Sequence, residues 1–553
     1  MREGPWRQEM DRGYGSAFPV QAEQILEGIR HGISIDFHGR RDISRSCINH
    51  PSTTKDAAVR AKMDSIIAAD CASGKTAGPF DEKPCVHFST SPLGAVPKGD
   101  SYRKVHDLSH PKHGDSINAG VAEKPTPIGS FDQATEAIRR LGRHCWLIKL
   151  DIEAAYRQVP VRIEDRPLLG FIWRGKYYYD RCLPFGLKSS CRLWELYATA
   201  LHYFLQHTLG IECVIHYVDD FLFVIKELRM ARTQLTQALK LCDFVGLPMA
   251  GHKTEGPVHM LIFLGLELDT ARMEARLGAA RLASLRALLT GWVTKTHATV
   301  LERQELAGIL NFACIVVRPG RTFLHRIIKG TAVLQKLLDT GKHGARAYTR
   351  FVVSEETRKD VQWWHHFAVT ARWNGIGLLY EHEWITSDRL ELFTDACNTG
   401  YGAYYQGAWF RGEWSEADLA EATRKDRISM PYLELRAVVL AAAAFGRQWR
   451  GQRITFRCDC KPACYALTNG YSKTPQMAAL LRRLHLIAAE CNFECRAEWI
   501  AGETNGIADC LSRMLDSNSP KQRASDEVAL RRLAPAAQRQ PVARPQLPPL
   551  NQL

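Results

Sequence analysis

The stretch HYVDDFLFV, residues 216–224, places two adjacent carboxylates inside an otherwise apolar and aromatic run. The residues on either side are also apolar, which is typical of two buried strands joined by a tight turn. Asp219 and Asp220 would therefore lie where an unpartnered charge costs several kcal/mol. Because something must offset that cost, the stretch predicts an acidic site that holds cations.

A third carboxylate stands in a comparable place upstream. In CWLIKLDIEAAYRQVPV, residues 145–161, Asp151 follows the apolar run 146–150, which predicts a strand. A lone aspartate at a strand end is usually a cap or turn residue. If Asp151 converges with Asp219 and Asp220, however, the three charges repel one another unless cations neutralise them. Two Mg²⁺ ions about 3.5–4 Å apart would do so, and would stabilise the attacking and leaving oxygens of a phosphoryl transfer.

Five motifs, which follow one another along the chain and include these acids, together resemble the motifs of one protein family. YVDD (217–220) resembles the metal-binding hairpin of reverse transcriptases, and LDIEAAYRQVPV (150–161) resembles their first catalytic motif. The other three resemble the fingers, the nucleotide-positioning motif and the primer grip: LGAVPKGDSYRKVHDLSHP (93–111), LPFGLKSSCRLWE (183–195) and FLGLEL (263–268). The resemblance implies an α+β and α/β multidomain protein whose polymerase has the right-hand arrangement of fingers, palm and thumb.

The resemblance also implies roles for the acids and for two basic residues. Asp151 and Asp219 would be the main ligands of two Mg²⁺ (or Mn²⁺) ions. Asp220 follows directly and would point the other way on a regular strand, so we expect a weaker metal contact from it. Lys98 and Arg103 would hold the incoming triphosphate, although each alone could be a solvated surface cation.

The nucleotide pocket follows from the same resemblance. Tyr156 would exclude a 2′-hydroxyl and so select deoxynucleoside triphosphates, the alternative being a packed core tyrosine. Phe185, Gly186 and Lys188 would shape the pocket of the templating base pair, and Lys253 is a candidate general acid for pyrophosphate. KSSCRLWE (188–195) lacks the proline and threonine usual after this glycine motif, which puts the local helix start in doubt.

Contacts to primer and template are expected further along the chain. Leu264 and Gly265 lie in the motif that resembles a primer grip. Arg318 and Arg321, near the end of the apolar helical segment 306–327, would contact the nucleic-acid backbone as part of a thumb. An ordinary bundle helix with a basic face is the alternative for these arginines.

A second set of acids follows near the C-terminus. We expect Asp395 on a strand, Glu434 on a helix, Asp459 at a strand end and Asp509 at a helix start. That order resembles ribonucleases H, and four carboxylates again suggest two divalent metal ions, here activating water to cut a phosphodiester. In the first strand region, FTDACNTGYGAYY (393–405), the two glycines at 400 and 402 predict tight turns.

Two departures from ribonuclease H lower the expected cleavage rate. The loop WIAGETNGIAD, residues 499–509, contains no histidine, a residue that many ribonucleases H carry there. Cys460 also follows Asp459 where a small polar residue is commoner. We expect the metal site itself to be intact.

Composition agrees with a nucleic-acid partner. The chain has 553 residues, too many for one core, and a formal net charge of +14, as expected for a protein that binds a polyanion. Its 16 cysteines include no CxxC pair, which fits reduced thiols. There is no apolar leader, and the longest apolar run, 437–445, is too short to span a bilayer. We therefore expect an intracellular protein, cytoplasmic and/or nuclear, with no membrane partner.

The expected organisation has five parts. They are an N-terminal extension without assignment (1–75), fingers and palm (76–272), a helical thumb and connection (273–387), a ribonuclease H-like domain (388–516) and a disordered tail rich in Pro, Arg and Gln (517–553).

The motifs SPLGAVPK, DLSHP, LNFA, RPGR and LELRA resemble tyrosine-recombinase retrotransposons of the DIRS and Ngaro kind more than gypsy-like LTR elements. The implied function is RNA- and DNA-directed DNA synthesis with cleavage of the RNA in hybrids, as part of transposition. Its partners would be an RNA template, a DNA primer, RNA–DNA hybrid and other proteins of the same element. The alternative is a domesticated or inactive protein that binds nucleic acid with the same folds. An RNA-dependent RNA polymerase is disfavoured by Tyr156 and by the second set of acids.

Overall fold

The computed structural model describes the whole chain except residues 43, 55, 100, 113, 341–347, 371–373, 380–382, 425–426, 515–527, 537–540, 544 and 548–553. The chain folds into two compact units. The first comprises residues 1–264 and 268–272, and the second comprises residues 265–267 and 273–553. Among the described residues, no helix combines the length and the apolar character needed to cross a membrane.

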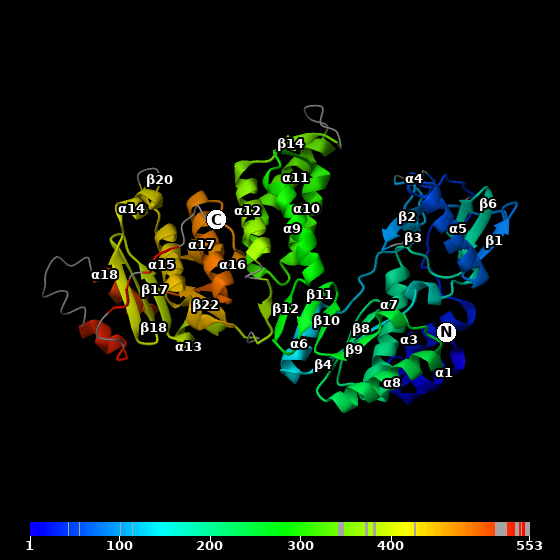
Figure 1. Cartoon of the computed structure of the whole chain (residues 1–553), viewed down its shortest axis with the longest axis horizontal. Helices are drawn as coiled ribbons and strands as arrows, with labels where there is room; N and C mark the ends of the chain where they lie inside the picture. The colour runs from blue at the N-terminus through cyan, green and yellow to red at the C-terminus, as the bar shows by residue number, and fades with distance from the viewer. Residues whose placement is uncertain are drawn as a thin grey trace. The chain divides into compact units, whose positions relative to one another are not determined.

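A four-stranded antiparallel sheet forms the centre of the first unit (Figure 1). Its order is β7 (Cys213–Tyr217), β8 (Asp220–Ile225), β4 (Trp146–Asp151) and β9 (Glu255–Val258). The strands are rich in β-branched and aromatic residues and are mostly buried, as their composition predicts. Three helices pack beside the sheet: α6 (Phe131–Leu141), α7 (Ser190–Tyr203) and α8 (Leu228–Val245).

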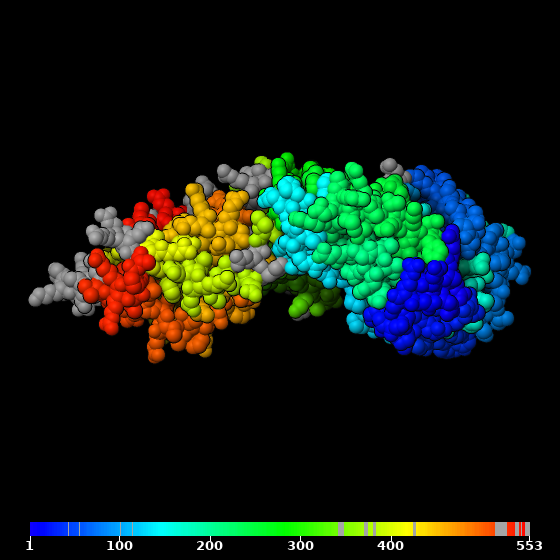
Figure 2. Space-filling model, turned by 90° about the horizontal axis from the view of Figure 1, so that it is seen from below, coloured from blue at the N-terminus to red at the C-terminus, as the bar shows by residue number. Residues whose placement is uncertain are grey.

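The N-terminal residues, which the sequence left without assignment, belong to this unit. Helices α1 (Glu3–Glu9) and α3 (Pro19–His31) pack on α8 and α7. The Trp6 indole lies edge-on to the rings of Tyr197 and Phe204, with centroids 5.8 and 5.6 Å away. Its nitrogen donates a 3.0 Å hydrogen bond to the carbonyl of Val245. In the space-filling view the N-terminal segment forms one dark-blue patch (Figure 2).

The rest of the unit has the position in the sequence expected for fingers. Helices α4 (Pro51–Thr54) and α5 (Ala57–Ala72) accompany a three-stranded sheet and a hairpin. The sheet has the order β1 (Thr76–Phe80), β6 (Lys176–Asp180), β5 (Gly170–Trp173), and the hairpin pairs β2 (Leu93–Lys98) with β3 (Ser101–His106). Asp180 is fully buried, and Lys104 and Arg157 lie 3.3 and 2.9 Å from its carboxylate.

The first half of the second unit is mainly helical, as expected for residues 273–387. The helices are α9 (Ala279–Val293), α10 (Val300–Ala313), α11 (His325–Asp339) and α12 (Glu355–Thr370). The short strands β10 (Met260–Phe263) and β11 (Leu266–Asp269) lie at the boundary between the two units along the chain. The short strands of this half are β12 (Glu274–Arg276), β13 (His297–Thr299), β14 (Arg350–Val352) and β15 (Ile376–Gly377). A capping box between Thr299 and Glu302 begins α10, and satisfies backbone groups that a helix start leaves free.

The second half of this unit combines two three-stranded sheets with helices (Figure 1). One is antiparallel: β17 (Leu392–Ala396), β18 (Gly400–Tyr405), β19 (Ala408–Glu413). The other is parallel: β16 (Ile385–Thr386), β22 (Arg453–Cys458), β23 (Glu494–Trp499), and β22 lies beside β17. The helices are α13 (Ser387–Leu390), α14 (Glu416–Ala422), α15 (Met430–Phe445), α16 (Lys461–Asn469), α17 (Pro475–Cys491) and α18 (Gly506–Arg513). The core is formed mainly by α15, which is buried along most of its length.

Two sequence predictions differ from the structure here. Gly400 and Gly402 do not form turns but belong to β18, where Gly402 pairs with Asp395 and leaves room for α18. The tail prediction does not hold for residues 528–534. Residues 528–533 are helical, and Leu530 and Ala534 pack against Tyr404 and Trp409. Apolar residues spaced four apart give this short segment a face that the core can bury.

Candidate active sites

The three carboxylates of the first set meet at one edge of the central sheet. Asp151, the last residue of β4, pairs directly with Asp220, the first residue of β8. Asp219 lies in the two-residue turn between β7 and β8, and its carbonyl accepts a 3.2 Å hydrogen bond from the backbone of Ile152. The convergence that the sequence predicted is therefore present.

The surroundings of Asp219 and Asp220 favour the uncharged form of these two acids. Burial raises the pKa of Asp219, and the neighbouring charge of Asp151 adds to the effect. Burial and the charges of Asp219 and Asp151 raise the pKa of Asp220 to about 6. Lys253 places Nζ 2.7 Å from Oδ2 of Asp151. Carboxylate oxygens are ligands that Mg²⁺ or Mn²⁺ takes, so the chemistry of these residues fits the expected cations.

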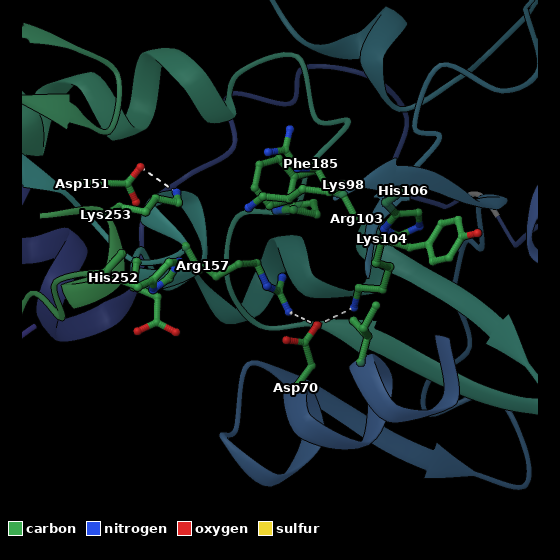
Figure 3. A pocket seen from close by; sticks show the side chains of 16 residues that line it. Asp70, Lys98, Arg103, Lys104, His106, Asp151, Arg157, Phe185, His252 and Lys253 are labelled. Atoms are coloured by element: carbon green, nitrogen blue, oxygen red, sulfur yellow. Dashed lines mark hydrogen bonds and ion pairs between the residues drawn. The ribbon is translucent and has the colours of Figure 1, made fainter. Parts of the chain in front are cut away.

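A cavity of about 360 Å³ opens beside Asp151 (Figure 3). Basic side chains line much of it, among them Lys98, Arg103 and Lys253. The Arg103 guanidinium lies 4.6 Å from the ring centroid of Phe185, which is a cation–π distance. The cavity thus combines the carboxylate edge with positive charge that an anionic ligand could meet.

Tyr156 lies behind the wall of this cavity. It sits in the short 3₁₀ helix η3 (Ala155–Gln158), and its ring centroid is 5.2 Å from that of Phe185. The next residue, Arg157, is buried and ion-paired with Asp70 at 3.1 Å and Asp180 at 2.9 Å. These buried ion pairs hold η3, and hence Tyr156, against the fingers strands. No sequence motif pointed to these ion pairs, because the partners come from separate segments.

The segment 183–195 is anchored by hydrogen bonds that replace the missing proline and threonine. Ser190 begins α7, and its hydroxyl donates to the carbonyl of Pro184 at 2.8 Å. Gly186 has a φ of +108°, and a Cβ there would collide with the carbonyl of His106. The Asn118 side chain bonds both the Gly186 carbonyl and the Lys188 amide at 2.8 Å. The helix start that the sequence left in doubt is therefore well formed.

The comparisons with known proteins bear on this site. Residues 101–268 match the family "Reverse transcriptase (RNA-dependent DNA polymerase)". This stretch contains the carboxylate edge and part of the basic cavity. It forms a reverse transcriptase domain. No curated protein matches the chain.

Several solved structures align with much of the chain at low identity. A foamy viral protease-reverse transcriptase dRH in complex with double-stranded DNA is 15% identical, with 86% of this chain and 78% of that chain covered and a TM-score of 0.49. A foamy viral protease-reverse transcriptase in complex with double-stranded DNA is 14% identical, with 86% and 93% covered and a TM-score of 0.48. The same kind of protein with an RNA/DNA hybrid is 14% identical, with 89% and 83% covered and a TM-score of 0.41.

The turn that carries Asp219 is held by α7 through residues that the sequence did not single out. The indole nitrogen of Trp194 donates to the carbonyl of Val218 at 2.8 Å. Glu195 lies 2.6 Å from the imidazole of His216 on β7. Both side chains belong to the motif 183–195, but nothing in that motif shows which strand they face.

The residues predicted to contact primer and template lie in different surroundings. Leu264 and Gly265 form the turn between β10 and β11, both with positive φ (+49° and +78°). Arg321 in η7 (Arg318–Phe323) is exposed and free to meet a phosphate. Arg318, in contrast, forms an ion pair with Glu494 of β23 and is about a quarter exposed. Glu494 also pairs with Arg453 at 3.0 Å and offsets the charge of Arg318 only in part, so a contact of Arg318 with nucleic acid stays a prediction.

The second set of acids lies on the elements that the sequence predicted. Asp395 is on β17, Glu434 on α15 and Asp509 on α18, while Asp459 directly follows β22. One ligand atom each from Glu434 and Asp459, together with Cys458, lies within 4.8 Å of the others. The Asp509 carboxylate is 2.6 Å from Arg513 one helical turn later.

Burial and mutual repulsion act strongly on the two inner acids. Burial, with the charges of Asp459 and Asp509, raises the pKa of Asp395 to about 7 although Ser512 donates to it. That hydroxyl lies 2.6 Å from Oδ2 of Asp395. Burial and the charges of Asp395 and Asp459 raise the pKa of Glu434 to about 9. The charges of neighbouring acids therefore act on both Asp395 and Glu434, and the oxygen donors of the four acids fit divalent cations such as Mg²⁺.

Proposed function

We propose that this chain is the RNA- and DNA-directed DNA polymerase of a retrotransposon, and that it also cleaves the RNA strand of RNA–DNA hybrids. One observation supports the polymerase activity. Asp151, Asp219 and Asp220 lie at the same sheet edge, beside a basic cavity, within a reverse transcriptase domain. Its substrates would be an RNA or DNA template, a DNA primer and deoxynucleoside triphosphates.

In the polymerase site each group has a distinct task. Divalent cations, when bound, supply charge neutralisation for the carboxylates and for the reacting phosphate oxygens. Lys98 and Arg103 bind the triphosphate from the opposite side of the cavity. Lys253 carries a proton 2.7 Å from Asp151 and is placed to give it to the departing pyrophosphate. Tyr156, fixed behind Phe185, limits the room beside the sugar.

The hybrid-cleaving site is proposed for Asp395, Glu434, Asp459 and Asp509. Two observations support it. Asp395 is on a strand, Glu434 on a helix, Asp459 at a strand end and Asp509 on a helix, and the charges of neighbouring acids raise the pKa of Asp395 and of Glu434. Ser512 and Asn505 orient the Asp395 carboxylate by hydrogen bonds of 2.6 and 3.4 Å. A hybrid would be bound through its backbone and 2′-hydroxyl groups, with little sequence preference.

The kind of retrotransposon is proposed from sequence motifs alone. SPLGAVPK, DLSHP and RPGR favour a tyrosine-recombinase retrotransposon of the DIRS and Ngaro kind. Other proteins of the same element would then supply recombination. The alternative function is a domesticated protein that binds nucleic acid without catalysis. The presence of all seven acids favours the enzyme, because a site no longer under selection should lose some of them.

Primer extension and hybrid cleavage, measured on the full chain with Mg²⁺, test the proposal. Asp219→Asn should abolish extension and leave hybrid cleavage, whereas Asp395→Asn should do the reverse. Asp243→Asn and Glu416→Gln change exposed acids of the same two units and serve as matched controls. If the wild-type protein binds hybrid but neither extends nor cuts it, the binding-protein alternative is correct.

A further inference from the structure

A buried thiol lies among the carboxylates of the second unit and has no task in the proposed cleavage. Cys458 is the last residue of β22 and is almost completely buried. Its Sγ lies 3.9 Å from Oε2 of Glu434. One oxygen of Asp459 lies within 4.8 Å of both atoms. The three side chains thus present one sulfur and two oxygens to a common point.

The spacing of these atoms suits a metal ion that accepts sulfur. A tetrahedral Zn²⁺ ion has a sulfur ligand at about 2.3 Å and oxygen ligands at about 2.0–2.2 Å, which places sulfur and oxygen about 3.6 Å apart. The observed separation of 3.9 Å between Cys458 and Glu434 needs only a small adjustment. Mg²⁺ takes oxygen ligands and has little affinity for thiolate, so the sulfur would discriminate between the two cations.

We propose that Glu434, Cys458 and Asp459 form a binding site for a thiophilic divalent cation of the Zn²⁺ class. On binding, a metal–sulfur bond forms, the S–H bond of Cys458 breaks, and the proton leaves to the solvent. Water completes the fourth position. Because the site takes Glu434 and Asp459, it cannot be filled while both carboxylates hold Mg²⁺.

Neighbouring groups orient the thiol toward this point. The backbone N–H of Cys460 donates to Sγ of Cys458 at 3.4 Å. The thiol of Cys464, on the first turns of α16, donates to the carbonyl of Cys458 at 3.4 Å. Such outer contacts fix the direction of a metal ligand. Asp459 is exposed, so a cation can enter from its side.

Metal binding and its consequence are separate claims. Binding depends only on the three side chains. The consequence, inhibition of hybrid cleavage by Zn²⁺, rests on the proposed ribonuclease H function. If the site exists but the chain does not cleave hybrids, the cation will bind without any effect on activity.

Cobalt(II) tests the binding claim directly, because a thiolate bound to Co²⁺ gives a ligand-to-metal charge-transfer absorption. The full-length protein is titrated with Co²⁺ and compared with Cys458→Ser and with the control Cys460→Ser, whose thiol lies outside the set. Wild type and Cys460→Ser should show the band, Cys458→Ser should lose it, and Zn²⁺ should displace it. A wild-type protein without the band, or a band unchanged in Cys458→Ser, overturns the proposal.

A second variant covers the case in which Cys458→Ser does not fold. If circular dichroism shows that Cys458→Ser is not folded, Glu434→Gln takes its place, and the Co²⁺ affinity should then fall at least about tenfold, as for the loss of any well-placed ligand contact. In the activity assay, each variant is measured with and without Zn²⁺ at fixed Mg²⁺. The Zn²⁺ concentration needed for half-inhibition should be at least about tenfold higher in Cys458→Ser than in wild type. Loss of cleavage in all samples without Zn²⁺ contradicts the proposed function and leaves the cobalt result standing.

Discussion

The indole nitrogen of Trp194 donates a 2.8 Å hydrogen bond to the carbonyl oxygen of Val218, the residue before Asp219. Val218 has a φ of +56°, a conformation that a β-branched residue rarely adopts. Such a residue costs about 1–3 kcal/mol and persists only where its surroundings fix it. Trp194 is completely buried on α7, so it is a rigid support for the turn that aims Asp219.

Replacing Trp194 by phenylalanine should slow DNA synthesis. Trp194→Phe keeps an aromatic ring but leaves the Val218 carbonyl unpaired, a loss of about 1–3 kcal/mol that corresponds to about 5- to 150-fold in rate if it acts on the turn that carries Asp219. We expect kcat for nucleotide addition to fall while KM for the nucleotide changes little. Trp173→Phe, which removes a similar bond to Asp64, is the matched control. Equal losses in both variants would show a general structural effect.

Tyr156 should set the choice between deoxynucleotides and ribonucleotides. Tyr156→Ala removes the ring next to Phe185 and makes room for a 2′-hydroxyl, so ribonucleotide incorporation should rise about tenfold or more relative to deoxynucleotide incorporation, a change of at least about 1.4 kcal/mol. Tyr156→Phe keeps the ring and should keep the selectivity. Competitive primer extension with both nucleotide types measures the ratio. An unchanged ratio in Tyr156→Ala would mean that Tyr156 is only a packing residue.

The metal-free protein should lose stability as the pH rises. The pKa of Asp395, about 7, and that of Glu434, about 9, both lie above the ordinary carboxyl range. The folded state therefore holds these protons more tightly than the unfolded state, and its advantage disappears as the pH rises through the two folded-state values. Calorimetry in EDTA should show Tm falling from about pH 4, where the unfolded chain loses these protons, to about pH 9, with Asp395 contributing up to about pH 7 and Glu434 up to about pH 9.

Two comparisons assign this pH dependence to the site. Glu434→Gln should flatten the fall of Tm, because an amide does not titrate, whereas Glu416→Gln should not. Mg²⁺ should raise Tm most at high pH, since the carboxylates are then free of protons. A fall of Tm that is the same in wild type and Glu434→Gln would contradict the assignment.

Gly402 should be intolerant of any side chain. A Cβ at Gly402 would collide with Leu511 of α18 and come within 2.8 Å of the Ser512 amide nitrogen. Gly402→Ala should cost about 1–3 kcal/mol and displace Asp509, lowering hybrid cleavage more than DNA synthesis. Gly308→Ala, in the interior of α10 with open space around it, should be neutral or stabilising by up to about 1 kcal/mol. Thermal unfolding and the two activity assays separate these outcomes.

Arg318 and Arg321 should differ in how they affect nucleic-acid binding. Arg321 is exposed, so Arg321→Ala should weaken hybrid binding and reduce the salt-dependence slope by about 1 if it contacts a phosphate. Arg318 is paired with Glu494, so Arg318→Ala should reduce the slope less than Arg321→Ala does and should lower Tm. Binding isotherms at several salt concentrations measure both slopes. A slope that falls only in Arg318→Ala would reverse the assignment.

The sequence by itself determined the two sets of acids and the elements that carry them. Asp151, Asp219 and Asp220 could be found because a carboxylate inside an apolar strand is costly and therefore informative. The same holds for Glu434, which stands in a helix that is apolar nearly all round. These signals are local, because they depend only on the residue types and on the spacing of apolar residues along a short stretch.

Only the tertiary structure decided how these local elements support one another. Three contacts join separate segments of the chain: the bond from Trp194 to Val218, the pairing of Arg157 with Asp180, and the ion pair of Arg318 with Glu494. The position of Cys458 beside Glu434 depends on how β22 meets α15. A sequence shows which side chains can ionise, donate or accept. Which of them meet is fixed by packing between distant segments, and that information is not carried by any single stretch.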